Sequence, residues 1–201
     1  NNIFGFINAG RQNLIPMFQR IKSNNSIAVK KAIDVLNEGG VIIYPTDTIY
    51  GFGCNANNHS AIKKINLIKG RKGPMSVLAP NKKTALKWMN LSKEEKIIVD
   101  KKLGGDSTVI VPIKNDIVSH LITGPNQSLG IRIPDHSFCN EISNNYPDPI
   151  TTTSVNRSGY KPLTIPDQIE NEFSNDIELL VDDGIINGKG STIYIFENKR
   201  W

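Results

Sequence analysis

The sequence has few of the features that mark disulfide-rich, zinc-binding or membrane proteins. Its 201 residues include only two cysteines, Cys54 and Cys139, and no CxxC pair, so we expect two buried, reduced thiols. No apolar run approaches the roughly 20 residues that a membrane-spanning helix needs. With 38% hydrophobic and 21% charged residues, the composition is that of an ordinary globular protein, which we expect to be cytoplasmic and without membrane contact.

Several common catalytic and nucleotide-binding motifs are also missing. The chain has no GxxxxGKT-type phosphate loop, no GxGxxG turn, no GxSxG elbow and no HExxH pair. His59, His120 and His136 are not spaced as metal ligands. These absences disfavour the usual nucleotide-binding folds and the common hydrolases.

The charge balance is basic but not decisive. A net charge of +5 is compatible with an anionic substrate, with RNA, or with neither. Aromatic residues are not interleaved with the basic ones, as they are in proteins that stack single-stranded RNA bases. The charge therefore permits several functions and selects none.

Helical and strand-like segments alternate along most of the chain. Residues 1–25 show no steady period, and we treat them as an N-terminal arm of open structure followed by one domain at 26–201. Ser26, Ser60 and Ser92 are candidate helix caps. Helices are predicted near 28–36, 60–70, 82–89, 92–103, 136–145 and 166–173, and strands near 41–44, 75–79, 107–112, 129–133, 149–156, 179–181 and 192–196. This order predicts an α/β domain with a mixed, twisted sheet.

Two cations stand two positions apart at the end of a predicted helix. Lys69 and Arg71 would share a face in extended chain but not in a helix, and Gly70 between them favours an extended or turn conformation. Such a pair suits a polyphosphate or a carboxylate. A solvated basic helix end is the alternative.

Small polar side chains alternate in a second stretch. Thr152, Ser154 and Asn156 would lie on one face of an extended segment, where they can bond phosphate oxygens or the waters around magnesium. A threonine-rich edge strand is the alternative.

A charged residue interrupts each of two apolar regions. Arg132 lies between Ile131 and Ile133 and needs either an acidic partner or a carboxylate ligand. Asp47 follows Pro45-Thr46 and is a candidate general base or magnesium contact, although an aspartate in a turn more often bonds its own backbone.

Five segments in order resemble the YrdC-type threonylcarbamoyl-AMP synthases. They are GGVIIYPTDTIYGFGCNA, IKGRKGPMSVLAP, STVIVP, LGIRIPDH and TTTSVNRSG, and the resemblance covers about residues 27 to 196. It implies a YrdC/RibB-like twisted α/β sheet flanked by helices, with a concave basic groove. The chain resembles the short, single-domain members of the family, which lack a C-terminal domain.

The resemblance also implies a reaction. ATP, L-threonine and bicarbonate give threonylcarbamoyl-AMP and pyrophosphate, with Mg²⁺ entering on the ATP phosphates. A threonylcarbamoyl transferase complex then modifies tRNA at N6 of an adenosine, and direct contact with tRNA is left open.

Particular residues take on roles by this resemblance. The Lys-x-Arg pair of the family falls on Lys69 and Arg71, expected to act catalytically on phosphate and substrate oxygens, and its Ser-x-Asn pair falls on Ser154 and Asn156, expected to hold phosphates with magnesium. The remaining implied contacts are Thr46 and Arg132 for threonine, and Thr108 and Ser191 for the nucleotide.

The sequence departs from the family at two places. Leu78 stands where some relatives have a histidine that contacts threonine, and Gly104-Gly105-Asp106 replaces a Pro-Gly-Pro turn. Two other functions remain open: a non-catalytic RNA-binding or ribosome-associated module, and a related domain that forms another carbamoyl-adenylate.

Overall fold

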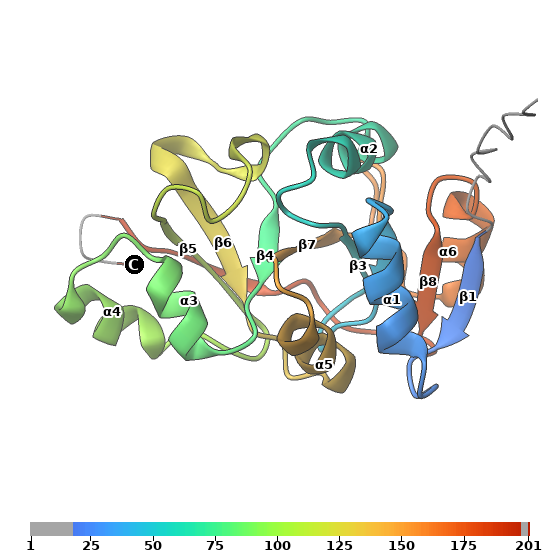
Figure 1. Ribbon diagram of the computed structural model, residues 1–201, viewed down its shortest axis with the longest axis horizontal. Helices are drawn as coiled ribbons and strands as arrows, with labels where there is room; N and C mark the ends of the chain where they lie inside the picture. Colours follow the sequence, from blue (N-terminus) through green and yellow to red (C-terminus); the bar gives the residue numbers. More distant parts are fainter. Residues whose placement is uncertain (1–17, 198–200) are drawn as a thin grey trace, which may run out of the picture.

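The computed structural model describes residues 18–197 and Trp201, and this part of the chain forms a single α/β domain (Figure 1). Its helices are α1 (Ala28–Asn37), α2 (His59–Lys69), α3 (Lys82–Trp88), α4 (Lys93–Asp100), α5 (Ser137–Asn145) and α6 (Pro166–Phe173), with short 3-10 turns η1 (His120–Ile122) and η2 (Pro125–Gln127). Its strands are β1 (Gln19–Lys22), β2 (Ile42–Tyr44), β3 (Gly51–Gly53), β4 (Ser76–Leu78), β5 (Ser107–Pro112), β6 (Ser128–Arg132), β7 (Ile150–Ser154), β8 (Leu179–Asp182) and β9 (Thr192–Ile195).

All nine strands of the described residues form one mixed sheet. The order is β1-β8-β2-β3-β7-β4-β6-β5-β9. The central strand β7 runs antiparallel to both of its neighbours, β3 and β4, and so joins the two halves of the sheet. The mixed α/β sheet predicted from the sequence is confirmed.

Helices cover both faces of this sheet. Helices α1 and α5 pack side by side on the near face in Figure 1, over a buried cluster that includes Leu36, Tyr44 and Phe138. The larger cluster on the other face takes Ile65 from α2 and Phe173 from α6. Each helix contributes one apolar stripe, as the spacing of its hydrophobic residues predicts.

The helix caps agree with the sequence at one site and differ at two. Ser92 begins α4 with a full capping box, in which its hydroxyl accepts from the Glu95 N–H and the Glu95 carboxylate accepts from the Ser92 N–H. The predicted caps at Ser26 and Ser60 are wrong. α1 begins after Ile27 without a side-chain cap, and α2 is capped by Asn58, whose side-chain oxygen accepts from Ala61.

Two strands lie where the sequence did not predict them. Strand β1 belongs to the segment expected to be an arm, and it pairs in parallel with β8; residues 1–17 of that arm lie outside the described part. Strand β3 follows the Pro45 to Thr48 loop as Gly-Phe-Gly and pairs with β2 and β7. Glycine is required at Gly53, because a Cβ there would approach Tyr44 Cε1 to 2.6 Å.

The two cysteines are buried and free, as expected. Within residues 18–197, no helix is both long and apolar enough to cross a bilayer.

Candidate functional site

A cavity of about 280 Å³ brings together most of the residues that the sequence singled out. It lies on one face of the sheet and crosses from β3 to β9. Of the predicted site residues, it is lined by Arg71, Thr108, Arg132, Ser154 and Ser191. Its other lining residues are Ile49, Tyr50, Gly51, Pro74, Met75, Ser76, Ile110, Thr152, Thr153, Gly190 and Ile193.

The floor of the cavity is made of small polar side chains on adjacent strands. Ser76 of β4 pairs in register with Thr152 of β7, so both side chains lie on the same face. Gly130 of β6 adds no side chain there, and a Cβ at this position would lie 2.3 Å from the Ser76 hydroxyl oxygen. The sheet therefore presents hydroxyl groups on an otherwise open surface.

Lys69 and Arg71 point to different surroundings. Lys69 is the last residue of α2, and Gly70 ends the helix in a left-handed conformation. Arg71 lines the cavity, and its Nη1 would be 2.6 Å from a Cβ at Gly73, so glycine leaves room for the guanidinium. Lys69 does not line the cavity and is only 2% exposed.

The Lys69 ammonium is bonded to the chain that follows β7. It donates to the backbone oxygen of Ser154, to the backbone oxygen of Asn156 at 3.0 Å and to Asn156 Oδ1 at 3.1 Å. Three acceptors match the three protons of an ammonium group. Burial, together with the positive charge of Arg71, lowers the pKa of Lys69 to about 8.

Ser154 and Asn156 form the other half of this contact. The Ser154 hydroxyl donates to Asn156 Oδ1 at 2.6 Å, and the Asn156 amide donates to the backbone oxygens of Arg157 and Tyr160. Lys69 and the Ser-x-Asn segment, which are 85 residues apart in the sequence, therefore lie in direct contact. In the arrangement described, Ser154 reaches the cavity and Asn156 supports it from behind.

The sequence predicted either an acidic partner or a carboxylate ligand for Arg132, and the structure shows the acidic partner, Asp47. Its Nη2 lies 2.8 Å from Asp47 Oδ1 and 3.1 Å from the Thr48 hydroxyl. Its Nε is buried and has no hydrogen-bond partner within the described residues. A buried donor without a partner is uncommon in proteins, and Arg132 is one of the residues that line the cavity.

Thr46 does not line the cavity, although the resemblance placed it in the threonine pocket. Its hydroxyl donates to the Ile49 backbone oxygen at 2.7 Å and accepts from the backbone N–H groups of Thr48 and Ile49. The residue is 2% exposed. Thr46 thus shapes the turn that presents Asp47 and Thr48, and the hydroxyl is already occupied.

Thr108 and Ser191 meet across the cavity wall. Their hydroxyl oxygens are 2.6 Å apart, which joins β5 to the loop before β9. The tyrosine beneath this loop was missed by the sequence reasoning: the Tyr50 hydroxyl donates to the Gly184 oxygen and accepts from the Asp183 N–H. Ser191 was predicted from the family resemblance alone, because no sequence motif surrounds it.

The two departures from the family fall outside the cavity lining. Leu78 is 1% exposed and belongs to the core cluster with Phe138 and Ile150. Gly104 and Gly105 have φ angles of +116° and +59°, a conformation that proline cannot adopt.

The side chains here do not form a magnesium cage of their own. Among the described residues, no three His, Cys, Asp or Glu side chains are grouped to hold a metal ion. Asn156 Oδ1 accepts from Ser154 and from the Lys69 cation, so a metal would have to displace both.

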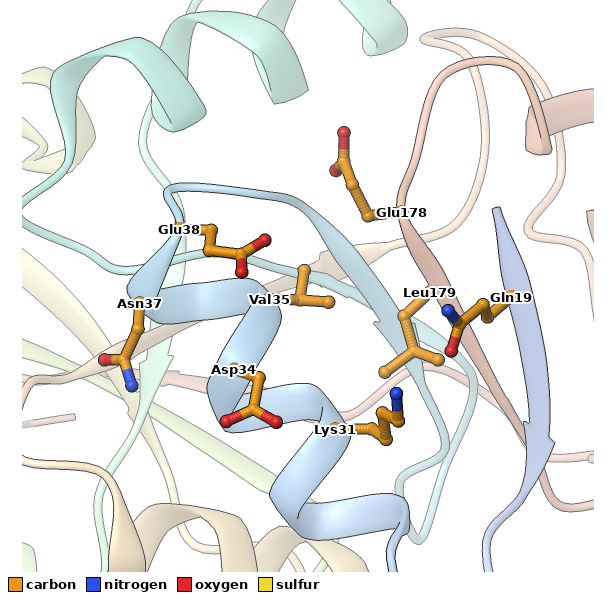
Figure 2. A pocket seen from close by; sticks show the side chains of 8 residues that line it. All are labelled: Gln19, Lys31, Asp34, Val35, Asn37, Glu38, Glu178 and Leu179. Carbon is orange, nitrogen blue, oxygen red and sulfur yellow. The ribbon is translucent and has the colours of Figure 1, made fainter. Parts of the chain in front are cut away.

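A larger cavity of about 430 Å³ lies at the other end of the sheet, between α1 and strands β1 and β8 (Figure 2). It contains none of the predicted site residues. Two of its acids are already paired: Asp34 with Lys30 at 2.7 Å, and Glu178 with Lys64 at 2.5 Å. Its size alone therefore does not make it the functional site.

Comparison with known proteins shows which family the chain belongs to. Residues 34–201 match the Sua5/YciO/YrdC family, which carries the description "Telomere recombination". The chain belongs to this family. The predicted resemblance is thereby confirmed, and the relatives show which activities occur among its members.

The curated relatives of this family member include threonylcarbamoyl-AMP synthases. The Photobacterium profundum threonylcarbamoyl-AMP synthase is 28% identical over 160 residues, covering 77% of this chain and 85% of the relative. A putative threonylcarbamoyl-AMP synthase of Methanocaldococcus jannaschii is 34% identical over 170 residues, covering 83% and 79%.

Solved structures of relatives share the fold. Pyrococcus abyssi Sua5, in its H234A/Y235A form, superposes with a TM-score of 0.81 at 26% identity over 90% of this chain, which spans 55% of that protein. The same protein has been solved in complex with L-threonine. Escherichia coli YciO has a TM-score of 0.79 at 18% identity, with 90% of each chain covered, and supports the fold alone.

Proposed function

We propose that this protein is an L-threonylcarbamoyladenylate synthase. It would use ATP, L-threonine and bicarbonate to form threonylcarbamoyl-AMP and pyrophosphate, for transfer of the threonylcarbamoyl group to tRNA by a partner complex. The observation that carries the proposal is the meeting of two arginines, Arg71 and Arg132, with the hydroxyl groups of Thr108, Ser154 and Ser191 in the lining of one cavity. Curated relatives of this activity support it.

The proposed chemistry needs charge neutralisation more than a strong base. The threonine amine condenses with bicarbonate to give a carbamate and water, and a carbamate oxygen then attacks the α-phosphorus of ATP with departure of pyrophosphate. Because both reactants are anions, the site must hold them together and in line. Two cations about a cavity of small hydroxyl groups are suited to this task.

Each of the cavity residues then has a distinct task. Arg71, at the cavity wall, would bind phosphate oxygens. The Thr108–Ser191 pair has one hydroxyl proton left to donate to the nucleotide, and Ser154 would do so by exchanging its bond to Asn156 Oδ1, while Arg132 would bind the threonine carboxylate. Magnesium would neutralise phosphate charge when it arrives with ATP.

Lys69 would act on the cavity indirectly, through its bonds to the segment that carries Ser154. Its ammonium holds the backbone of Ser154 and Asn156, so it keeps the Ser154 hydroxyl at the cavity. Direct contact between Lys69 and a phosphate would require some of these bonds to be exchanged for bonds to the substrate.

The test is a product assay with purified protein. ATP, Mg²⁺ and bicarbonate are incubated with and without L-threonine, and pyrophosphate and the adenylate product are measured by mass spectrometry. We expect pyrophosphate release that depends on both threonine and bicarbonate. Release that does not respond to threonine would refute the proposal.

A substrate analogue tests the assignment of Arg132 in the same assay. L-threoninamide keeps the amine and side chain of threonine but lacks the carboxylate charge. We expect it to be used at least about tenfold less efficiently, because a lost charge-assisted contact is worth about 1.5 to 3 kcal/mol. Equal use of the amide would remove carboxylate recognition from the mechanism.

A further inference from the structure

Both oxygens of the Asp47 carboxylate accept hydrogen bonds from the protein itself. Its side chain is 12% exposed. Oδ1 accepts from Arg132 Nη2 at 2.8 Å, and Oδ2 accepts from the backbone N–H of Asp135 at 2.8 Å. Asp47 is also not among the residues that line the cavity, so it does not face a substrate there, as a general base or a magnesium contact would.

The turn that carries Asp47 is built to present it. The Thr46 hydroxyl accepts from two backbone N–H groups within the turn and donates to the Ile49 oxygen, which fixes the backbone on both sides of Asp47. Thr48, the next residue, offers its hydroxyl to the same Arg132 nitrogen at 3.1 Å. One short turn therefore supplies two acceptors to one end of a guanidinium.

Holding one end of a guanidinium determines where the other end points. The group is planar and rigid, so its N–H directions are fixed relative to each other. With Nη2 bound to Asp47 and Thr48, the unpaired Nε–H of Arg132 cannot turn away without breaking a buried ion pair. Asp47 and Thr48 therefore fix how the rest of the Arg132 guanidinium lies at the cavity that Arg132 lines.

We propose that Asp47 is a positioning residue for recognition of the amino-acid carboxylate by Arg132. It contacts no substrate and acts only through the guanidinium, while its bond to Asp135 ties the same turn to the chain that follows β6. The proposal rests on the proposed function for the identity of the carboxylate. A purely structural ion pair would instead support folding and leave substrate affinity unchanged in any variant that folds.

The first experiment is a kinetic comparison of Asp47→Asn with the wild-type protein. We expect the KM for threonine to rise at least tenfold, while the KM for ATP and kcat at saturating threonine change less than threefold. Asp167→Asn is the matched control: it also removes a carboxylate from an arginine, Arg20, but on the far side of the sheet. Its kinetic constants should equal those of the wild type.

A double-mutant cycle separates positioning from general damage. If Asp47 acts only through Arg132, then Asp47→Asn should have no further effect on threonine KM in an Arg132→Gln background. Equal and additive effects in the two backgrounds would overturn the proposal. So would an Asp47→Asn protein that is folded by circular dichroism and keeps the wild-type KM for threonine.

The contact between Asp47 and Arg132 can also be tested without substrate, by nuclear magnetic resonance. The arginine Nε–H signals form a separate group in the ¹⁵N–¹H spectrum, and Arg132→Gln identifies the signal of Arg132. Asp47→Asn should shift or broaden that signal, and Asp167→Asn should not. An unchanged signal refutes the positioning role. If the signal changes but the protein shows no threonine-dependent activity, the positioning of Arg132 by Asp47 is retained and the proposed function is refuted.

Discussion

Replacement of Lys69 by methionine should disable the candidate site without removing the fold. Methionine is nearly as long as lysine and apolar, so it can fill the buried space that the lysine side chain occupies. It cannot donate to the backbone oxygens of Ser154 and Asn156. The end of β7 would then lose the contact that holds the Ser154 hydroxyl at the cavity.

The size of the effect follows from the bonds that are lost. Two charge-assisted bonds to backbone oxygens, at about 1.5 kcal/mol each, sum to about 3 kcal/mol. If that energy keeps the Ser154 segment in its active position, kcat/KM should fall about 100-fold. The third bond, to Asn156 Oδ1, is left out because the Ser154 hydroxyl also donates to that oxygen.

The same residue gives the activity a defined pH dependence. Above a pKa of about 8 the Lys69 amine has two protons for three acceptors, so wild-type activity should decline as the pH rises through 8. Stability should move in the opposite direction. Because the pKa of Lys69 in the folded state lies below the ordinary lysine value of 10.5, the unfolded chain holds this proton between pH 8 and 10.5, and the free energy of unfolding should rise across that range.

The assay measures threonine-dependent pyrophosphate release from pH 7 to 10, with urea unfolding at the same pH values. The control is Lys63→Met, which removes a lysine from the exposed side of the same helix and should match the wild type. The reasoning fails if Lys69→Met is folded and retains activity within about threefold of the wild type. It fails equally if Lys69→Met keeps the wild-type decline above pH 8.

Two further substitutions test the cavity wall and the sheet. Arg71→Ala should lower kcat/KM for ATP at least about tenfold in the pyrophosphate assay while thermal melting stays unchanged, because one charge-assisted contact to phosphate is lost and Arg71 is half-buried; wild-type kinetics would remove it from the site. Gly53→Ala should lower the free energy of unfolding by about 1 to 3 kcal/mol in urea, since its Cβ would lie 2.6 Å from the Tyr44 ring. Gly190→Ala, whose Cβ would meet nothing within 4 Å, should leave it unchanged, and equal stability of the two variants would contradict the packing argument.

Local chemistry carried most of the prediction of the fold. The capping box at Ser92, the apolar spacing of α1 and α6 and the β-branched run of β5 each needed only neighbouring residues to be recognised. Strand β3 could not be recognised in this way, because Gly-Phe-Gly has little β propensity and its place depends on pairing with β2 and with β7, about a hundred residues later. The caps of α1 and α2 were misplaced by one or two residues for a similar reason: several polar residues stood near each helix start.

In the candidate site, too, the residue types were predictable from the sequence and their partners were not. Sequence patterns and family resemblance identified the cations and hydroxyl groups, and Arg132 was expected to need either a partner or a ligand. Only the fold shows that Arg132 has Asp47 as its partner and a buried, unpaired Nε–H, and that Lys69 is bonded across 85 residues to Ser154. Thr46 was placed in the pocket by resemblance, but the bonds that occupy its hydroxyl depend on the conformation of a turn.

The last two strands have a consequence for how the chain folds during synthesis. β8 inserts between β1 and β2, and β9 pairs with β5, so both ends of the sheet are completed by residues after 178. Until these residues leave the ribosome, β2 and β5 keep unpaired edges, which are prone to pair with other chains. Because Ser191 and Ile193 also line the cavity, the nascent protein cannot form the complete site before its final strand is in place.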